Sequence, residues 1–112
     1  MSGKELDGRC LERLFAVIED RRTADPARSH TARLLARGPQ AVAKKVGEEA
    51  VEAVIEAVGG DKSRLVSESA DLLYHLLVLW AARGIRPAEV WAALEARRGV
   101  SGLAEKRARK KG

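Results

Sequence analysis

Apolar residues recur along this chain every three or four positions, the spacing that places side chains on one face of a helix. Proline stands where first turns would begin, glycine stands where helices would end, and Asp61 is placed to cap the helix that follows it. The pattern predicts long helices over about residues 5–22, 39–58, 62–83 and 87–98, and a short helix over residues 31–36. No segment alternates with the two-residue period of a strand. We therefore expect an all-α fold, a bundle of about four main helices in one domain over residues 1–112.

The composition indicates a soluble protein of the cytoplasm. Hydrophobic residues make up 46% of the 112 residues, which is an ordinary fraction, and charged residues make up 33%, which is a high one, as in a soluble globular domain. The single cysteine, Cys10, cannot form a disulfide within the chain, and no signal peptide follows Met1. The longest apolar run, residues 72–82, is shorter than the ~20 residues that a membrane-spanning helix needs. We expect no association with a membrane.

The charge balance indicates a polyanionic partner. The formal net charge is +5, and the basic tail over residues 99–112 ends in EKRARKKG. Basic proteins of this kind bind nucleic acid or a nucleotide that carries several phosphates. Charge alone leaves both classes of partner open.

Carboxylates concentrate in the stretch KVGEEAVEAVIEA, residues 45–57. Glu48, Glu49, Glu52 and Glu56 fall within an arc of about 100° on a helix, and apolar residues occupy the rest. Taken alone, this is an amphipathic helix with a solvated acidic face. However, glutamates four residues apart repel one another, so a bound cation is an alternative explanation.

A second pair of carboxylates, Glu68 and Asp71, lies in a segment that is apolar nearly all the way round, which is typical of a core helix. Carboxylates there are costly unless they are paired, protonated or bound to a metal. A salt bridge to a lysine or arginine is one alternative, and an exposed first turn, where acids suit the helix dipole, is another. His75 continues the same stripe, four residues after Asp71.

The two clusters share one spacing. Glu49 and Glu52 are three residues apart, and so are Glu68 and Asp71. If the two helices pack together, these side chains meet at one point. Oxygen ligands of this kind suit Mg²⁺, with Mn²⁺ as the alternative ion, better than they suit zinc. Glu56 has no partner in this pattern, and we expect it on the surface.

The motif EExxE followed by ExxD resembles the signature of the all-α, MazG-like nucleoside triphosphate pyrophosphohydrolases. Within that group, the segments GPQAVAKKVGEEAVEAVIEA, ESADLLYHLLVLW and SGLAEKRARK are similar to the phosphoribosyl-ATP pyrophosphohydrolases of histidine biosynthesis. The resemblance runs from about Leu11 to Lys110. It implies hydrolysis of phosphoribosyl-ATP to phosphoribosyl-AMP and pyrophosphate, an early step of L-histidine biosynthesis.

The resemblance also implies roles for individual residues. Glu49, Glu52, Glu68 and Asp71 would hold Mg²⁺. Glu48 would either support these ligands from behind or act as the base that orients the attacking water. Basic side chains close to these glutamates and near the tail would bind the substrate phosphates: Lys44, Lys45, Arg97, Arg98, Lys106 and Arg109. The resemblance further implies an intertwined homodimer, in which helices of two chains complete the bundle and the active site. Trp80 and Trp91 are expected anchors of that interface.

The chain departs from the family pattern at two places. His30 stands between Ser29 and Thr31, where the family usually has an aromatic residue. Arg107 and Ala108 stand in the tail where the family more often has small residues. We therefore expect the loop near the substrate to stack or hydrogen-bond differently, and the tail to contact phosphates differently.

Two other functions compete with this interpretation. A house-cleaning pyrophosphohydrolase of the same fold would share the four metal ligands and act on non-standard nucleoside triphosphates. A small basic helical protein could instead bind nucleic acid, but the sequence lacks a helix-turn-helix with a basic recognition face, and its most patterned helix is acidic. We expect a small-molecule substrate and no nucleic-acid partner.

Overall fold

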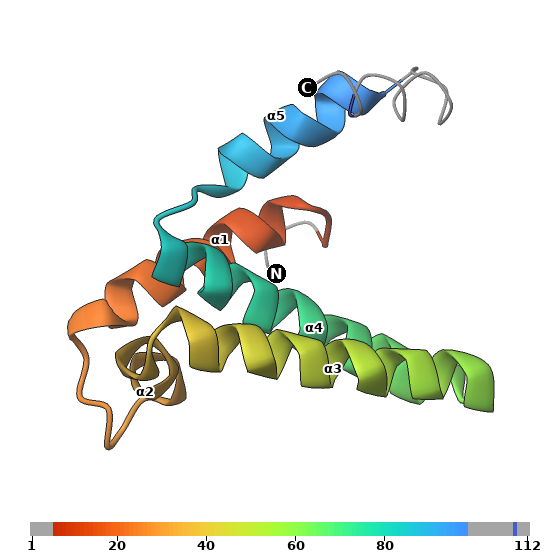
Figure 1. Cartoon of the computed structure of the whole chain (residues 1–112), viewed down its shortest axis with the longest axis horizontal. Coiled ribbons are helices and arrows are strands. Elements are labelled where there is room, and N and C mark those ends of the chain that lie inside the picture. Colours follow the sequence, from red (N-terminus) through yellow and green to blue (C-terminus); the bar gives the residue numbers. More distant parts are fainter. Residues whose placement is uncertain (1–5, 99–108, 110–112) are drawn as a thin grey trace, which may run out of the picture.

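The computed structural model describes residues 6–98 and residue 109 (Figure 1). Its helices are α1 (Arg9–Asp20), the 3₁₀ turn η1 (Arg21–Thr23), α2 (His30–Arg37), α3 (Pro39–Gly59), α4 (Lys62–Arg83) and α5 (Pro87–Arg97). The described residues contain no strand, which confirms the all-α prediction. Apart from residue 109, the predicted basic tail lies outside the described residues.

Helices α3 and α4 form a long antiparallel hairpin, against which the other helices are placed (Figure 1). Helix α1 packs on α4, and α2 packs on the start of α3. The core lies at this end of the hairpin and contains Phe15, Ile18, Leu34, Val42, Leu77, Val78 and Ala81. The opposite end of the hairpin projects beyond this core, and α5 extends away from the hairpin.

The helix ends follow local backbone chemistry. Gly38 has a φ of 92°, which favours glycine, and it separates α2 from Pro39 in the first turn of α3. The Asp61 carboxylate accepts a hydrogen bond from the backbone N–H of Arg64 at 3.2 Å, which confirms the predicted N-cap of α4. The prediction for the first helix was wrong at its start: residues 6–8 form a turn, and the Asp7 carboxylate accepts the backbone N–H of Arg9 at 2.9 Å.

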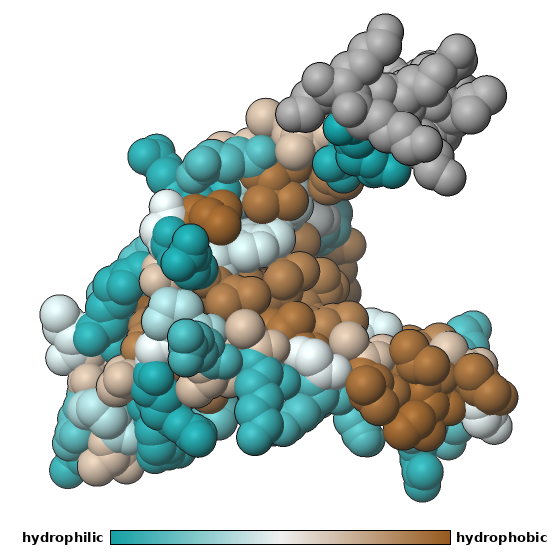
Figure 2. Space-filling view, viewed as in Figure 1, coloured by the Kyte–Doolittle hydropathy of each residue, from teal (hydrophilic) through white to brown (hydrophobic). Residues whose placement is uncertain are grey.

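The far end of the hairpin has an apolar surface. Within α3, Val51, Val54, Ile55 and Val58 are between 53 and 84% exposed. Val66 and Leu73 of α4 are also exposed, so the prediction that this part of α4 lies in a core is wrong for the single chain. Figure 2 shows apolar surface at the end of the hairpin and in the hollow below α5. The arc of α3 predicted to face inward therefore faces outward.

Helix α4 is long and apolar enough, by length and composition alone, to cross a membrane. Core helices of soluble proteins pass the same test, so this property is weak evidence for a membrane span. Only 22% of its most apolar stretch is buried within this chain. Most of this apolar stretch of α4 is therefore left uncovered by the rest of the described chain.

Candidate metal centre

Three carboxylates meet between α3 and α4. Glu49 of α3 and Glu68 and Asp71 of α4 each offer an oxygen, and these oxygens all lie within 4.8 Å of one another. Side chains three or four residues apart lie on the same face of a helix. Because α3 and α4 pack side by side, Glu49 on one helix faces Glu68 and Asp71 on the other. Glu49 and Glu68 are partly buried, whereas Asp71 is exposed. We call these residues the carboxylate group.

The carboxylate group is electrostatically unfavourable as it stands. Partial burial raises the pKa of the Glu68 carboxyl above its ordinary value, and the negative charges of nearby side chains raise it further, in decreasing order Glu49, Asp71, Glu52 and Glu56. None of the ion pairs among the described residues involves a member of the group. The salt-bridge alternative is therefore not realised in the described part of the chain. A divalent cation fits a donor set of this kind, because it would replace mutual repulsion by attraction.

Glu52 and Glu56 lie beside the carboxylate group. Glu52, predicted as the fourth ligand, is exposed and not a member of the group, although its charge acts on Glu68. Glu56, which we expected on the surface, is partly buried and is not a member of the group, and its charge also acts on Glu68. The physical reason is the helical repeat, which places residues 49, 52 and 56 on one side of α3.

Glu48 and the neighbouring lysines lie next to the carboxylate group along α3. The Glu48 carboxylate is exposed and pairs with the Lys45 ammonium at 3.7 Å. Both residues, together with Lys44, line a small pocket of about 180 Å³ between α2 and α3. Arg37 at the end of α2 lines the same pocket, and the sequence interpretation did not include it. Its position follows from the sharp α2–α3 turn at Gly38, which sequence periodicity alone does not reveal.

The basic residues predicted near the tail are not brought to the carboxylate group by this chain. Arg97 ends α5, and Arg98 follows it and pairs with Glu95 at 2.7 Å. Figure 1 shows the end of α5 well separated from the hairpin. Lys106 lies outside the described residues, and Arg109 is described only as an exposed helical residue. Their predicted phosphate contacts stay predictions.

A cluster of rings lies one turn beyond Asp71. The buried His75 is 6% exposed, and its Nδ1 lies 2.7 Å from the Asp71 carbonyl oxygen. A carbonyl only accepts, so Nδ1 carries a proton and donates it, whereas Nε2 is buried and has no hydrogen-bond partner among the described residues. Tyr74 packs edge-on against His75, with ring centroids 4.9 Å apart. His75 therefore links the ring cluster to the backbone of Asp71.

His30, at the position where the sequence departs from the family pattern, contacts the ring of Tyr74. Its ring stacks on Tyr74 at a centroid distance of 6.3 Å and an interplanar angle of 22°. The Tyr74 hydroxyl is 2.5 Å from the Thr31 hydroxyl, which fixes the ring. Burial, followed by the charges of Arg33, His75 and Lys45, lowers the pKa of His30 below its ordinary value. His30 is therefore a neutral ring at neutral pH.

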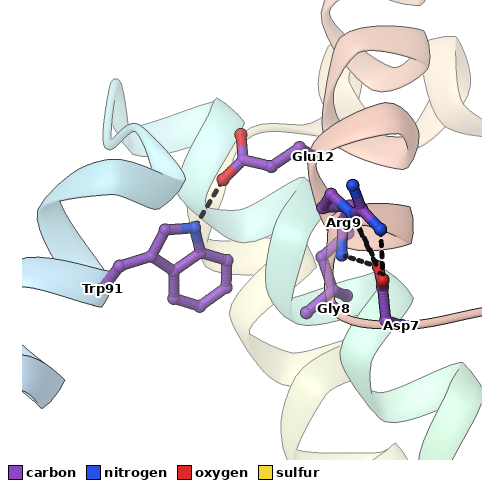
Figure 3. Close-up of a pocket in the computed structure, with 6 residues that line it drawn as sticks. Asp7, Gly8, Arg9, Glu12 and Trp91 are labelled. Atoms are coloured by element: carbon purple, nitrogen blue, oxygen red, sulfur yellow. Dashed lines mark hydrogen bonds and ion pairs between the residues drawn. The ribbon is translucent and has the colours of Figure 1, made fainter.

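A larger pocket lies elsewhere, between the start of α1 and α5 (Figure 3). It measures about 610 Å³ and is lined by Asp7, Gly8, Arg9, Leu11, Glu12 and Trp91. The Trp91 indole N–H donates to the Glu12 carboxylate. Trp91 also packs edge-on against Trp80, with ring centroids 5.9 Å apart, so the two expected interface anchors contact each other within one chain. No predicted site residue lines this pocket.

Comparison with known proteins identifies the family. Residues 11–98 match the family model described as phosphoribosyl-ATP pyrophosphohydrolase. A protein of Azospirillum brasilense named phosphoribosyl-ATP pyrophosphatase is 56% identical over 110 residues, covering 98% of this chain and 99% of the relative. A relative of the same name from Cereibacter sphaeroides is 64% identical over 99 residues, covering 88% of this chain and 96% of the relative.

A third relative of that name, from Granulibacter bethesdensis, is longer than this chain. It is 63% identical over 101 residues, and these cover 90% of this chain but only 63% of the relative. The matched region contains the carboxylate group, the Lys44–Lys45 pair and the ring cluster. By family model and by sequence identity, the chain belongs to the phosphoribosyl-ATP pyrophosphohydrolase family, whose members are hydrolases.

Proposed function

We propose that this chain hydrolyses phosphoribosyl-ATP to phosphoribosyl-AMP and pyrophosphate in histidine biosynthesis. The relatives that support this proposal are named phosphoribosyl-ATP pyrophosphatase. The observation that carries it is the carboxylate group, in which oxygens of Glu49, Glu68 and Asp71 lie within 4.8 Å of one another. Such a group is suited to bind the cation that phosphate hydrolysis requires.

The ion in this proposal is Mg²⁺, with Mn²⁺ as the alternative. Glu49, Glu68 and Asp71 would hold it, and Glu52 would join them by a change of side-chain rotamer. Carboxylate oxygens without histidine or cysteine favour these hard ions over zinc. When bound, the ion neutralises charge on the phosphate oxygens.

Glu48 is the proposed base. Its carboxylate would accept a proton from a water whose oxygen attacks the α-phosphorus of the ATP moiety. The bond from that phosphorus to the oxygen bridging the α- and β-phosphates breaks, and pyrophosphate leaves with the electron pair. The Lys45 ammonium lies 3.7 Å from the Glu48 carboxylate and forms an ion pair with it at the protein surface. Lys44 and Lys45 would contact substrate phosphates.

The active form in this proposal is a homodimer in the cytoplasm. The exposed residues Val51, Val54, Ile55 and Val58 form an apolar face on the hairpin, which a second hairpin would cover. Pairing of hairpins would also bury the apolar part of α4 and bring residues of one chain close to the site of the other. A small-molecule substrate, and neither nucleic acid nor a membrane, would be the partner of this dimer.

We expect the purified protein to release pyrophosphate from phosphoribosyl-ATP when Mg²⁺ is present and to lose this activity when the ion is chelated. Pyrophosphate release measured with Mg²⁺, with EDTA, and after Mg²⁺ is restored tests the proposal. A panel of standard and non-standard nucleoside triphosphates is the comparison. Higher kcat/KM for a free triphosphate than for phosphoribosyl-ATP would support the house-cleaning alternative instead.

We also expect Mg²⁺ to stabilise the fold in a pH-dependent way. The raised pKa of Glu68 means that the folded chain holds this proton more tightly than the unfolded chain, so stability falls as pH rises through that pKa. A bound cation takes the place of the proton. At ten times its dissociation constant, Mg²⁺ should therefore add about 1.4 kcal/mol above the raised pKa and progressively less as pH falls through it.

Thermal unfolding at several pH values, with Mg²⁺ or with Na⁺ at equal ionic strength, measures this effect. The Asp71→Asn variant should lose most of the Mg²⁺ response. Equal stabilisation by both ions, or an undiminished response in the variant, would show that the carboxylate group does not bind the cation.

A further inference from the structure

The small pocket between α2 and α3 concentrates positive charge. The pocket has a volume of about 180 Å³. Its lining contains the basic residues Arg37, Lys44 and Lys45, together with Leu34, Ala41 and Glu48. Gly38, at a φ of 92°, turns the chain sharply from α2 into α3 and so places Arg37 against side chains one and two turns into α3. Glu48 is already paired with Lys45, which leaves a net positive surface in the pocket. Such a site is suited to bind a small anion.

The pocket adjoins the carboxylate group along α3: Glu48 lines it, whereas Glu49, Glu68 and Asp71 do not. Ala41 and Lys45 precede Glu49 by eight and four residues, which corresponds to about 12 and 6 Å along the helix axis. A phosphate bound by the carboxylate group through a cation is therefore not the phosphate that fills this pocket. The ring of His30, whose pKa responds to the charge of Lys45, lies near the pocket.

We propose that Arg37, with Lys44 and Lys45, binds the 5-phosphate of the phosphoribosyl group. This inference rests on the proposed function, because only phosphoribosyl-ATP carries a phosphate monoester in addition to its triphosphate. The cation at the carboxylate group neutralises the triphosphate, whereas the monoester at the other end of the molecule needs a cationic site of its own. A volume of about 180 Å³ suits a phosphate and is too small for a nucleoside.

Arg37 would thus determine specificity. Its planar guanidinium can donate two parallel hydrogen bonds to one phosphate, which an ammonium group cannot do. Free ATP has no group for this pocket, so Arg37 distinguishes phosphoribosyl-ATP from the nucleoside triphosphates that a house-cleaning enzyme accepts. It acts on binding and not on the bond that is broken.

The Arg37→Gln variant tests this role by comparing two substrates. We expect kcat/KM for phosphoribosyl-ATP to fall about fivefold to tenfold, mainly through an increase in KM. The loss is modest because Arg37 is exposed and a charged hydrogen bond at the surface contributes little to binding. Turnover of ATP, tested as the comparison substrate, should change less than about twofold, because ATP lacks the monoester. Inhibition by ribose 5-phosphate should weaken in the variant, and inhibition by pyrophosphate should not.

Arg28→Gln is the matched control, because Arg28 is an exposed arginine that does not line the pocket. Thermal unfolding of both variants checks that they fold. Equal losses for phosphoribosyl-ATP and ATP, with weaker inhibition by pyrophosphate, would assign the pocket to the leaving group and overturn the inference. Unchanged kinetics in Arg37→Gln would overturn it as well. Failure of the proposed function is a different result: the unsubstituted protein would then not hydrolyse phosphoribosyl-ATP.

Discussion

Replacing Asp71 by asparagine is expected to lower kcat by about 10²–10³-fold while the chain stays folded. Asparagine keeps the size and one oxygen of aspartate but removes the negative charge that would bind the cation. Loss of the ion removes several kcal/mol of transition-state stabilisation, and about 1.4 kcal/mol corresponds to each factor of ten. Asp71 is exposed, so the substitution leaves no buried cavity. Glu49→Gln is expected to have an effect of similar size.

Kinetics of pyrophosphate release, with circular dichroism and thermal unfolding of the same samples, would measure both effects. Asp20→Asn is the matched control, since Asp20 is exposed and pairs with Arg21 far from the carboxylate group. Glu68→Gln adds a second readout. It should abolish turnover yet raise the unfolding temperature of the metal-free protein, because it removes one charge from a group of mutually repelling carboxylates. Near-normal turnover in Asp71→Asn and Glu49→Gln would return these residues to a structural role.

The double variant Val54→Lys, Ile55→Lys is expected to convert a homodimer into a folded monomer. Both side chains are more than half exposed in the single chain, so charge at these positions does not disturb the core. In a dimer that buries the apolar face of the hairpin, the same lysines would be desolvated without partners, at a cost of several kcal/mol each. Lysine is a good helix former, so α3 itself should persist.

Size-exclusion chromatography with light scattering would measure the mass of the variant, and circular dichroism its helix content. Turnover should fall together with the dimer if the partner chain completes the site. Ala36→Lys is a suitable control, because Ala36 is exposed on α2 and outside the apolar face. A variant that stays dimeric and active would exclude this face of the hairpin as the interface.

Much of the architecture follows from local signals. Residues 62–83 were predicted as a helix, and α4 has these bounds. The Asp61 N-cap and the Gly84 C-cap set its ends through contacts with neighbouring residues in the sequence. The pairing of the carboxylates could also be expected, since equal three-residue spacings on two consecutive helices meet when a short turn joins them. Here Glu49, Glu68 and Asp71 do come together. The first helix began later than predicted because the Asp7 side chain formed a turn that periodicity does not detect.

The direction in which α3 faces was not predictable in the same way. Its glutamates and its valines occupy opposite arcs, and the hydrophobic effect alone would turn the valines inward. In the chain, Glu49 and Glu56 are partly buried while Val54 and Val58 are exposed. The proposed homodimer accounts for this inversion, because a second hairpin would cover the exposed valines, and the pattern of one chain does not contain that second surface.

The sequence by itself determined the helices, their ends and the residue types of the candidate metal centre, because caps, turns and spacing act over a few residues. Only the tertiary structure decided which carboxylates share a site, that Glu56 lies beside it, and that Arg37 joins Lys44 and Lys45. Those relations depend on how α2 and α4 pack on α3, and packing depends on contacts between residues distant in sequence.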